Sequence, residues 1–205
     1  MKRASQPSFC ITRCNFSDLP ASFIKGATLV LTDEQLIVEI RSGSKKAFDV
    51  LYEKFRPRLL AYCRRILGNT DDAEDVVQDV FIKAHDKIDS LMNGILLKHW
   101  LFSIARNEAL MKIRKRHPET SIDADAVWDD ETPIDQLEHQ ETSEIVQRLL
   151  RDLKLEYREV LVLREYDGLS YSDIAKIIGV SEDVIRVRIY RARNAMTEKL
   201  KRFYY

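Results

Sequence analysis

The stretch LSYSDIAKIIGVSEDVIRVRIYRARNAMTEKL, residues 169–200, predicts a helix, a three-residue turn and a second, basic helix. Ser170 or Ser172 can cap the first helix, and Ser181 can cap the second. Gly179 can take the positive φ that a tight turn between crossing helices needs. A basic helix held against a short supporting helix is the geometry that enters the major groove of DNA. The stretch therefore indicates DNA binding and identifies the helix that reads the DNA.

Apolar spacing separates the buried side of these two helices from the exposed side. Positions that recur every three or four residues form a packed face. They are Ile174, Ala175 and Ile178 in the first helix, and Ile185, Ile189, Ala192 and Met196 in the second. The arginines left on the sides and outer face of the second helix are Arg186, Arg188, Arg191 and Arg193.

The whole chain has 205 residues, and its composition predicts an all-α fold. Only 6 Gly and 5 Pro interrupt long periodic segments, and a hydrophobic fraction of 45% is enough for real cores. Lys and Arg total 33, as do Asp and Glu, and a net charge of zero over the whole chain argues against nucleic-acid binding. Locally, residues 118–144 hold ten acidic residues and no Lys or Arg, whereas residues 176–202 hold eight basic residues against three acidic ones. The net charge of zero is therefore the sum of a basic C-terminal segment and an acidic segment before it.

Helical periodicity divides the chain into two small helical domains. Helices are expected at residues 33–41, 45–67, 70–88, 97–115, 142–153 and 156–166, before the opening stretch. Thr32 and then Thr70 or Asp71 are expected N-caps, and Pro57 is expected to kink or break its helix. The acidic segment is expected to be an extended, mobile linker. The expected organisation is a flexible extension at 1–31, a first domain at 32–117, a linker at 118–141 and a second domain at 142–205.

The three cysteines are too few and too scattered for a disulfide framework. Cys63 falls on an apolar helix face and is expected in the core. Cys10 and Cys14 have no nearby His or second Cys pair, which favours incidental thiols over a zinc site. No apolar run approaches the ~18 residues of a membrane span, and the N-terminus lacks the apolar region of a signal peptide. We expect a cytoplasmic protein without a membrane partner.

Two separated motifs resemble one family. Residues 71–85, DDAEDVVQDVFIKAH, resemble the polymerase-binding helix of bacterial sigma factors of the sigma-70 family. Residues 153–196, LKLEYREVLVLREYDGLSYSDIAKIIGVSEDVIRVRIYRARNAM, resemble their promoter-reading C-terminal domain, region 4. Residues 98–116, KHWLFSIARNEALMKIRKR, look like the stretch of region 2 that melts and reads the −10 element. The resemblance covers about residues 32–202, and two domains with a short linker are similar to the extracytoplasmic-function (ECF) class.

The resemblance implies a factor that binds core RNA polymerase, recognises the −35 and −10 elements and promotes DNA melting. It implies no enzymatic activity, no cofactor, no metal and no small-molecule substrate, and it makes an anti-sigma factor an expected partner. Asp75, Gln78 and Asp79 would dock on the coiled coil of the polymerase β′ subunit, and the second domain would contact the β flap. Their spacing puts these three residues on one helix face, where carboxylates can pair with Arg or Lys of a partner helix. From spacing alone, an ordinary solvated acidic face is the better interpretation, and the resemblance reverses that preference.

In the family, bases of the non-template strand are flipped out at the −10 element and held by a loop and the following helix. The candidate contacts here are Asn93, Lys98, His99, Arg106, Asn107, Lys112, Arg114, Lys115 and Arg116. The loop, SLMNGILLKHW at residues 90–100, departs from the Gly, Ser and aromatic residues that members often have, so the captured base stays open. Trp100 is expected in the core, and for residues 114–116 a basic cluster at a helix C-terminus is an equal alternative.

The outer face of the last helix is expected to read the −35 element. Its candidates are Ser181, Asp183, Val184, Arg186, Val187, Arg188, Tyr190 and Arg191. Arginine can grip guanine through two hydrogen bonds, and the other polar residues are better suited to phosphates. Val184 and Val187 either contact thymine methyl groups or are partly buried, and Arg193 suits packing and phosphate contact equally.

Three alternatives stay open at this point. The acidic linker is either a plain tether or a mimic of nucleic acid in the polymerase cleft. The chain is alternatively a stand-alone helix-turn-helix regulator that binds duplex DNA, which would leave Asp75, Gln78 and Asp79 without a purpose. An enzymatic alternative would use Cys10 and Cys14 in a small metal- or thiol-dependent activity.

Overall fold

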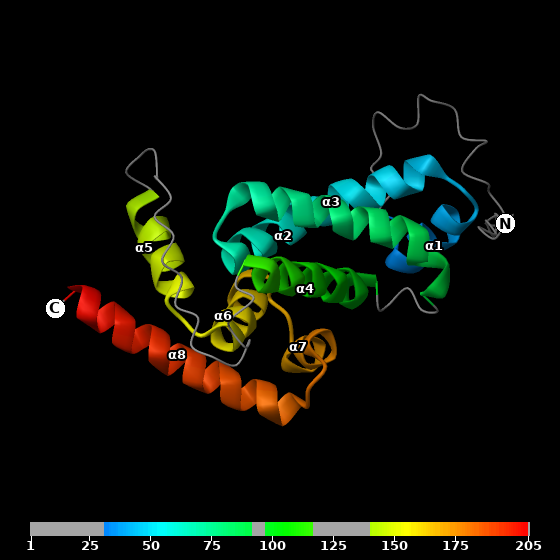
Figure 1. The fold of residues 1–205 in the computed structure, drawn as a ribbon. Coiled ribbons are helices and arrows are strands. Elements are labelled where there is room, and N and C mark those ends of the chain that lie inside the picture. The colour runs from blue at the N-terminus through cyan, green and yellow to red at the C-terminus, as the bar shows by residue number, and fades with distance from the viewer. Residues whose placement is uncertain (1–30, 92–96, 117–139, 205) are drawn as a thin grey trace, which may run out of the picture.

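The first half of the chain forms a helical bundle. The computed structural model describes residues 31–91, 97–116 and 140–204, and every regular element in these ranges is helical. The bundle consists of α1 (Asp33–Arg41), α2 (Lys45–Leu67), α3 (Thr70–Lys87) and α4 (Leu97–Arg116), with a 3-10 turn at Ile88–Ser90. α2, α3 and α4 pack against one another, and α1 lies against α2 at one end of the bundle (Figure 1).

The second half contains four more helices. They are α5 (Gln140–Arg151), α6 (Leu155–Leu161), which continues as a π-helical turn at Val162–Tyr166, α7 (Tyr171–Ile178) and α8 (Glu182–Tyr204). α8 is a single long rod that packs against α6, α7 and α5 (Figure 1). The three residues between α7 and α8 confirm the predicted helix-turn-helix.

Local capping explains where the helices of this motif begin and end. Ser170 accepts the backbone N–H of Asp173 at 3.1 Å, and the Asp173 carboxylate accepts the N–H of Ser170 in return. Gly179 ends α7 with φ of 82°, a conformation that costs side-chain-bearing residues energy. Ser181 then accepts the N–H of Val184 at 3.4 Å. The turn between α7 and α8 therefore lies where the sequence predicts it.

One local prediction is wrong, and a second, that Pro57 kinks or breaks its helix, is wrong for the break. Asn69 rather than Thr70 or Asp71 caps α3, and its side chain accepts the N–H of Asp71 at 2.8 Å. α2 also runs unbroken through Pro57. The proline removes one backbone hydrogen bond, but Phe55 and its neighbours on the same face are buried, and this packing holds the helix on both sides of Pro57.

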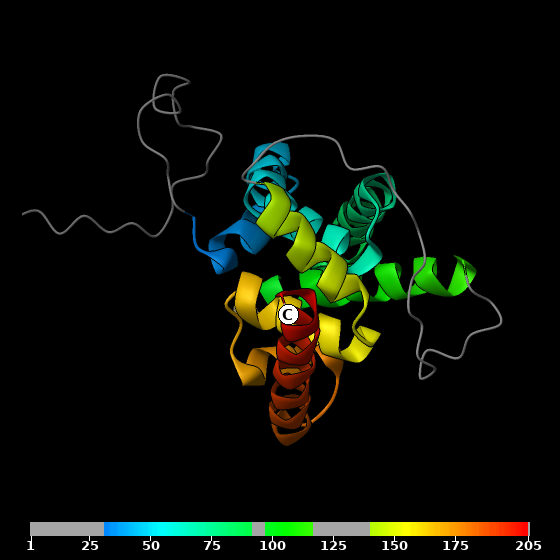
Figure 2. The same ribbon diagram turned by 90° about the vertical axis from the view of Figure 1, so that its left-hand side faces the viewer.

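The two helix groups share one hydrophobic core. α4 packs against α7, and α2 packs against α5, α6 and the π-helical turn. Leu150, Leu153 and Val160 from the second half belong to the same buried cluster as Leu59 and Cys63 from the first. Figure 2 shows the α5–α8 group lying directly against the bundle. This close packing of the halves has no counterpart in the sequence-based prediction of two tethered domains.

Several predicted features lie outside the described residues: the extension with Cys10 and Cys14, the loop with Asn93, and most of the acidic linker. Within the described ranges, no helix is both long enough and apolar enough to cross a membrane. In the same ranges, no group of three or more His, Cys, Asp or Glu side chains is arranged to hold a metal ion. Cys63 is buried as predicted, and burial raises the pKa of its thiol to about 12.

Candidate nucleic-acid interface

α8 presents an open mixed surface opposite its buried stripe. Ile185, Ile189 and Ala192 are fully buried, which directs the intervening residues outward. Val184, Val187 and Tyr190 are 39%, 46% and 67% exposed. Both valines are therefore exposed enough to contact a partner.

The polar candidates on α8 differ in their exposure and in whether they already pair with a carboxylate. Ser181, Asp183, Arg186 and Arg191 are exposed, although Arg186 also pairs with Glu182 at 3.2 Å one turn earlier. Arg188 is half-buried and pairs with Glu156 of α6 at 3.3 Å. Arg193 pairs with Glu165 at 2.7 Å, a contact that ties α8 to the π-helical turn. A shallow cavity of about 430 Å³ lies between α6 and the reading face, lined in part by Val184, Val187, Arg188 and Arg191.

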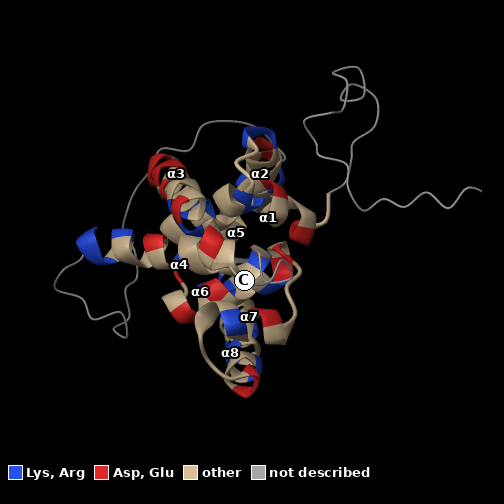
Figure 3. Ribbon diagram, turned by 90° about the vertical axis from the view of Figure 1, so that its right-hand side faces the viewer, with Lys and Arg blue, Asp and Glu red and all other residues tan. Residues whose placement is uncertain are grey.

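The far end of α4 is also basic, and part of it is neutralised within the bundle. Arg114 and Lys115 are exposed. Arg116 pairs closely with Asp72 of α3, and Lys112 lies 3.0 Å from carboxylate oxygens of both Asp72 and Asp75. Figure 3 shows the blue end of α4 projecting beside the acidic end of α3. Only part of the predicted basic cluster is thus free for a partner.

The near end of α4 faces the second half of the molecule. Lys98, His99 and Arg106 are partly buried there, whereas Asn107 is exposed. His99 Nε2 lies 2.8 Å from a carboxylate oxygen of Asp173 on α7. Burial and the nearby Arg58 lower the pKa of Lys98. Trp100 is half-buried and packs against the core, which agrees with its predicted structural role.

Arg106 makes a largely buried ion pair with Glu159 of α6. The Arg106 Nε donates to Glu159, and Nη2 donates to its other oxygen at 3.3 Å. The Tyr62 hydroxyl donates to the same carboxylate at 3.4 Å. Burial raises the pKa of Glu159, and Arg106 opposes that rise. Sequence reasoning missed Tyr62 and Glu159, although a charged pair, Arg158 and Glu159, directly before an apolar run was a usable signal.

Arg158, the other member of that pair, joins segments rather than facing a partner. Its guanidinium donates to the Leu150 carbonyl at 2.8 Å, the Ile66 carbonyl at 3.0 Å and the Leu153 carbonyl at 3.2 Å. Burial and the neighbouring Arg151 lower the pKa of Arg158 to about 10. Ile66 belongs to α2, so this arginine anchors α6 to the end of the first bundle.

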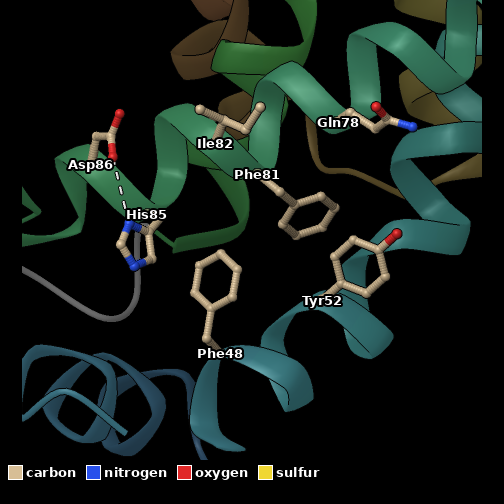
Figure 4. A pocket seen from close by; sticks show the side chains of 7 residues that line it. All are labelled: Phe48, Tyr52, Gln78, Phe81, Ile82, His85 and Asp86. Atoms are coloured by element: carbon tan, nitrogen blue, oxygen red, sulfur yellow. Dashed lines mark hydrogen bonds and ion pairs between the residues drawn. The ribbon is translucent and has the colours of Figure 1, made fainter. Parts of the chain in front are cut away.

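The acidic face of α3 carries Asp75, Gln78 and Asp79, all three exposed as predicted. Beside it lies an open apolar groove of about 420 Å³ between α2 and α3, which the sequence did not predict. Figure 4 shows Phe48 and Tyr52 of α2 facing Phe81 of α3, with Gln78 at one end of the groove. Ile82, 59% exposed, adds an apolar side chain to the same face. A partner on α3 therefore meets both carboxylates and apolar surface.

Two family models match the chain: Sigma-70 region 2 over residues 51–118, and Sigma-70 region 4 over residues 143–196. The RNA polymerase sigma-H factor of Pseudomonas aeruginosa is 32% identical over 181 residues, covering 82% of this chain and 94% of the relative. The ECF RNA polymerase sigma-E factor of Escherichia coli is 32% identical, covering 83% and 95%. The ECF factor SigW of Bacillus subtilis is 30% identical, covering 80% and 95%.

Solved structures match as well. The sigma factor RpoE of Bartonella quintana, in complex with the anti-sigma factor NepR, is 35% identical with a TM-score of 0.66, covering 76% of this chain and 98% of that one. CnrH, in complex with the cytosolic domain of CnrY, shares the fold with a TM-score of 0.65 at 24% identity, covering 83% and 98%.

Proposed function

The chain belongs to the sigma-70 family of RNA polymerase sigma factors, in its ECF class, and on that premise we propose which of its surfaces bind which partner. As a promoter-recognising sigma factor it binds core RNA polymerase and promoter DNA, and it is an initiation factor rather than an enzyme. The observation that carries the proposal is the open face of α8 with its arginines, on the same chain as the acidic face of α3. We assign residues 32–117 to region 2, 118–141 to the linker and 142–205 to region 4.

Region 4 reads the −35 element through α8. The contacts that we assign are Ser181, Asp183, Val184, Arg186, Val187, Arg188, Tyr190 and Arg191. Exposure of Val184 and Val187 supports contact with thymine methyl groups in the major groove. Arg186 is the strongest candidate for guanine, because it is exposed near the helix start, where recognition helices approach the bases.

Region 2 binds the −10 element through α4. The contacts that we assign are Asn93, Lys98, His99, Arg106, Asn107, Lys112, Arg114, Lys115 and Arg116. Arg114 and Lys115 are free for phosphate, whereas Lys112 and Arg116 are already paired with α3. We therefore expect Arg114 and Lys115 to contribute most of the backbone affinity of this end of the helix.

The α3 face binds the β′ coiled coil through Asp75, Gln78 and Asp79, and region 4 binds the β flap. The neighbouring groove, with Phe81 and Ile82, supplies apolar contact beside the carboxylates. An anti-sigma factor is a further partner, because a 35% identical structure is a sigma factor in complex with one. A protein that binds core polymerase acts where the polymerase is, so we place the chain in the cytoplasm.

Run-off transcription with core RNA polymerase over a randomised promoter library tests this proposal. We expect transcripts that select paired −35 and −10 sequences. Asp79→Lys reverses an exposed charge on α3 and is expected to weaken core binding at least tenfold, whereas Glu53→Lys, an equivalent change on α2, leaves it unchanged. Failure to bind core polymerase, together with tight binding to duplex DNA alone, would instead support a stand-alone regulator.

A further inference from the structure

Tyr171 lies where the helix-turn-helix joins the segment before it. It is the first residue of α7, and the reciprocal hydrogen bonds between Ser170 and Asp173 fix the backbone on both sides of it. Its side chain is half-buried and packs against the core, so part of the ring is held and part stays accessible. The fold therefore sets the position of this ring before any partner binds.

Two guanidinium groups lie over the ring of Tyr171. The Arg164 Cζ is 5.0 Å from the ring centroid, and the Arg186 Cζ is 5.7 Å from it. Arg164 belongs to the π-helical turn and also donates to the Leu169 carbonyl at 2.7 Å, which fixes it on that side. The face of an aromatic ring is negative and attracts an arginine above it. Tyr171 thus connects α8, through Arg186, to the segment before α7.

Arg186 makes a second contact, and the two contacts differ in what they demand of its guanidinium. Its Nη2 donates to Glu182 at 3.2 Å, so this pair occupies an N–H group. The contact with Tyr171 is an attraction between the positive charge and the ring, and it needs no N–H hydrogen bond. Guanine accepts two hydrogen bonds from the N–H groups of one arginine. Glu182 therefore competes with guanine for Arg186, whereas Tyr171 does not.

Arg186 is also the arginine on α8 that gains most from being held. Its side chain is 62% exposed, and an exposed arginine loses rotamer freedom when it binds a base. A contact that restricts the side chain beforehand lowers this entropy cost of binding. Arg188 and Arg193 are held differently, by carboxylates of Glu156 and Glu165.

We propose that Tyr171 is a positioning residue for −35 recognition, whose ring holds Arg186 in the direction from which its guanidinium reaches guanine. Tyr171 acts through Arg186 and competes with the pairing of Arg186 and Glu182. The inference rests on the proposed function, because it takes Arg186 to be the guanine contact. It places a determinant of base choice on α7, outside the helix that enters the major groove.

Run-off transcription by the full chain with core polymerase tests the inference. The promoters differ at the −35 position where Arg186→Ala abolishes the preference for guanine. The measured quantity is the ratio of transcription from the guanine promoter to transcription from the other three. General loss of affinity or of folded protein lowers transcription from all four promoters alike, so it leaves this ratio unchanged.

Tyr171→Leu removes the aromatic face, and we expect the ratio to fall about two- to fivefold, as for loss of a cation–π contact at an exposed site. Tyr171→Phe is expected to keep the wild-type ratio, because it keeps the ring and loses only the hydroxyl. That hydroxyl serves another residue: Glu165 and, more weakly, Tyr171 raise the pKa of Arg193. In an Arg186→Ala chain, Tyr171→Leu is expected to lower the ratio no further.

Tyr166→Leu is the matched control, because the Arg65 Cζ lies 3.8 Å from the centroid of the Tyr166 ring. The change removes an arginine–tyrosine contact of the same kind, with an arginine of α2 instead of α8, and should leave the ratio unchanged. Circular dichroism checks that each variant is folded. If Tyr171→Leu is not, Tyr171→Met, a longer apolar side chain without a ring, carries the test.

Two results would overturn the inference. One is a folded Tyr171→Leu or Tyr171→Met chain with the wild-type ratio, and the other is an Arg186→Ala chain with an unchanged preference for guanine. Both differ from failure of the proposed function, in which the wild-type chain itself gives no promoter-directed transcription with core polymerase.

Discussion

At the scale of single residues, substitution of Arg186 distinguishes contact with a DNA base from contact with a phosphate. Arg186→Ala is expected to lower transcription mainly on promoters that carry, in the −35 element, the guanine that Arg186 contacts. A bidentate contact with guanine contributes ~1–3 kcal/mol of discrimination against the other bases. Run-off transcription over a −35 library measures this. Lys201→Ala, near the other end of α8 and paired with Glu198, is the control. Equal losses on all −35 sequences would show that Arg186 holds a phosphate instead.

Arg158 makes a prediction about stability. Arg158→Leu removes the arginine donor from the carbonyls of Arg151, Leu153 and Ile66, whereas the Leu150 carbonyl keeps the N–H of Leu153. Each unsatisfied buried group costs ~1–3 kcal/mol, so we expect the free energy of unfolding to fall by about 3 kcal/mol or more. Urea denaturation followed by circular dichroism measures it. Arg148→Leu, on the exposed side of α5, should change it little; similar losses in both variants would contradict the role given to Arg158.

At the scale of elements, substitution of two glycines distinguishes the effect of backbone strain on stability from an effect on DNA binding. Gly43 and Gly179 have φ of 87° and 82°, and an added Cβ would meet nothing within 4 Å at either. Alanine at each position is therefore expected to cost only the backbone strain, about 1–2 kcal/mol. Chemical denaturation should show similar losses for Gly43→Ala and Gly179→Ala.

Promoter binding should then distinguish the two glycine variants. Gly179 sets the angle between α7 and α8, whereas Gly43 lies between α1 and α2, far along the chain from the reading helix. Only Gly179→Ala is expected to weaken −35 duplex binding in an electrophoretic mobility assay. Equal effects on binding would indicate that both act through stability alone.

The elements also show what the sequence can and cannot predict. Ser170 and Gly179 act on neighbours within four residues, so the limits of α7 are visible in the local pattern. The cap of α3 was misplaced because Asn69, Thr70 and Asp71 are consecutive and all can cap, and only the geometry selects one. Arg106 and Glu159 are 53 residues apart, and no local pattern marks two such residues as partners. The exposed surfaces were therefore predictable, but the contact between the two halves was not.

At the scale of the whole molecule, the packing between the two helix groups predicts that the halves associate without a covalent link. Fragments 1–117 and 118–205, expressed separately and mixed, are expected to associate, because three ion pairs and a shared apolar core cross between them. Isothermal titration calorimetry should show affinity falling severalfold between about 0.05 M and 0.5 M salt, as screening weakens the exposed part of the pairs. Association that is absent at every salt concentration would contradict the shared core.

The three ion pairs at that contact also limit how such proteins can be recombined. A chimera that takes region 2 from this chain and region 4 from a relative inherits the basic side chains at positions 58, 99 and 106 but not necessarily acids at 159, 167 and 173. Promoter choice would then change for two reasons at once. The helix that contacts the −35 element is new, and the side chains at positions 159, 167 and 173 pair less well with the first half. Engineers who exchange regions to build orthogonal gene circuits should therefore transfer these three acidic positions together with the reading helix.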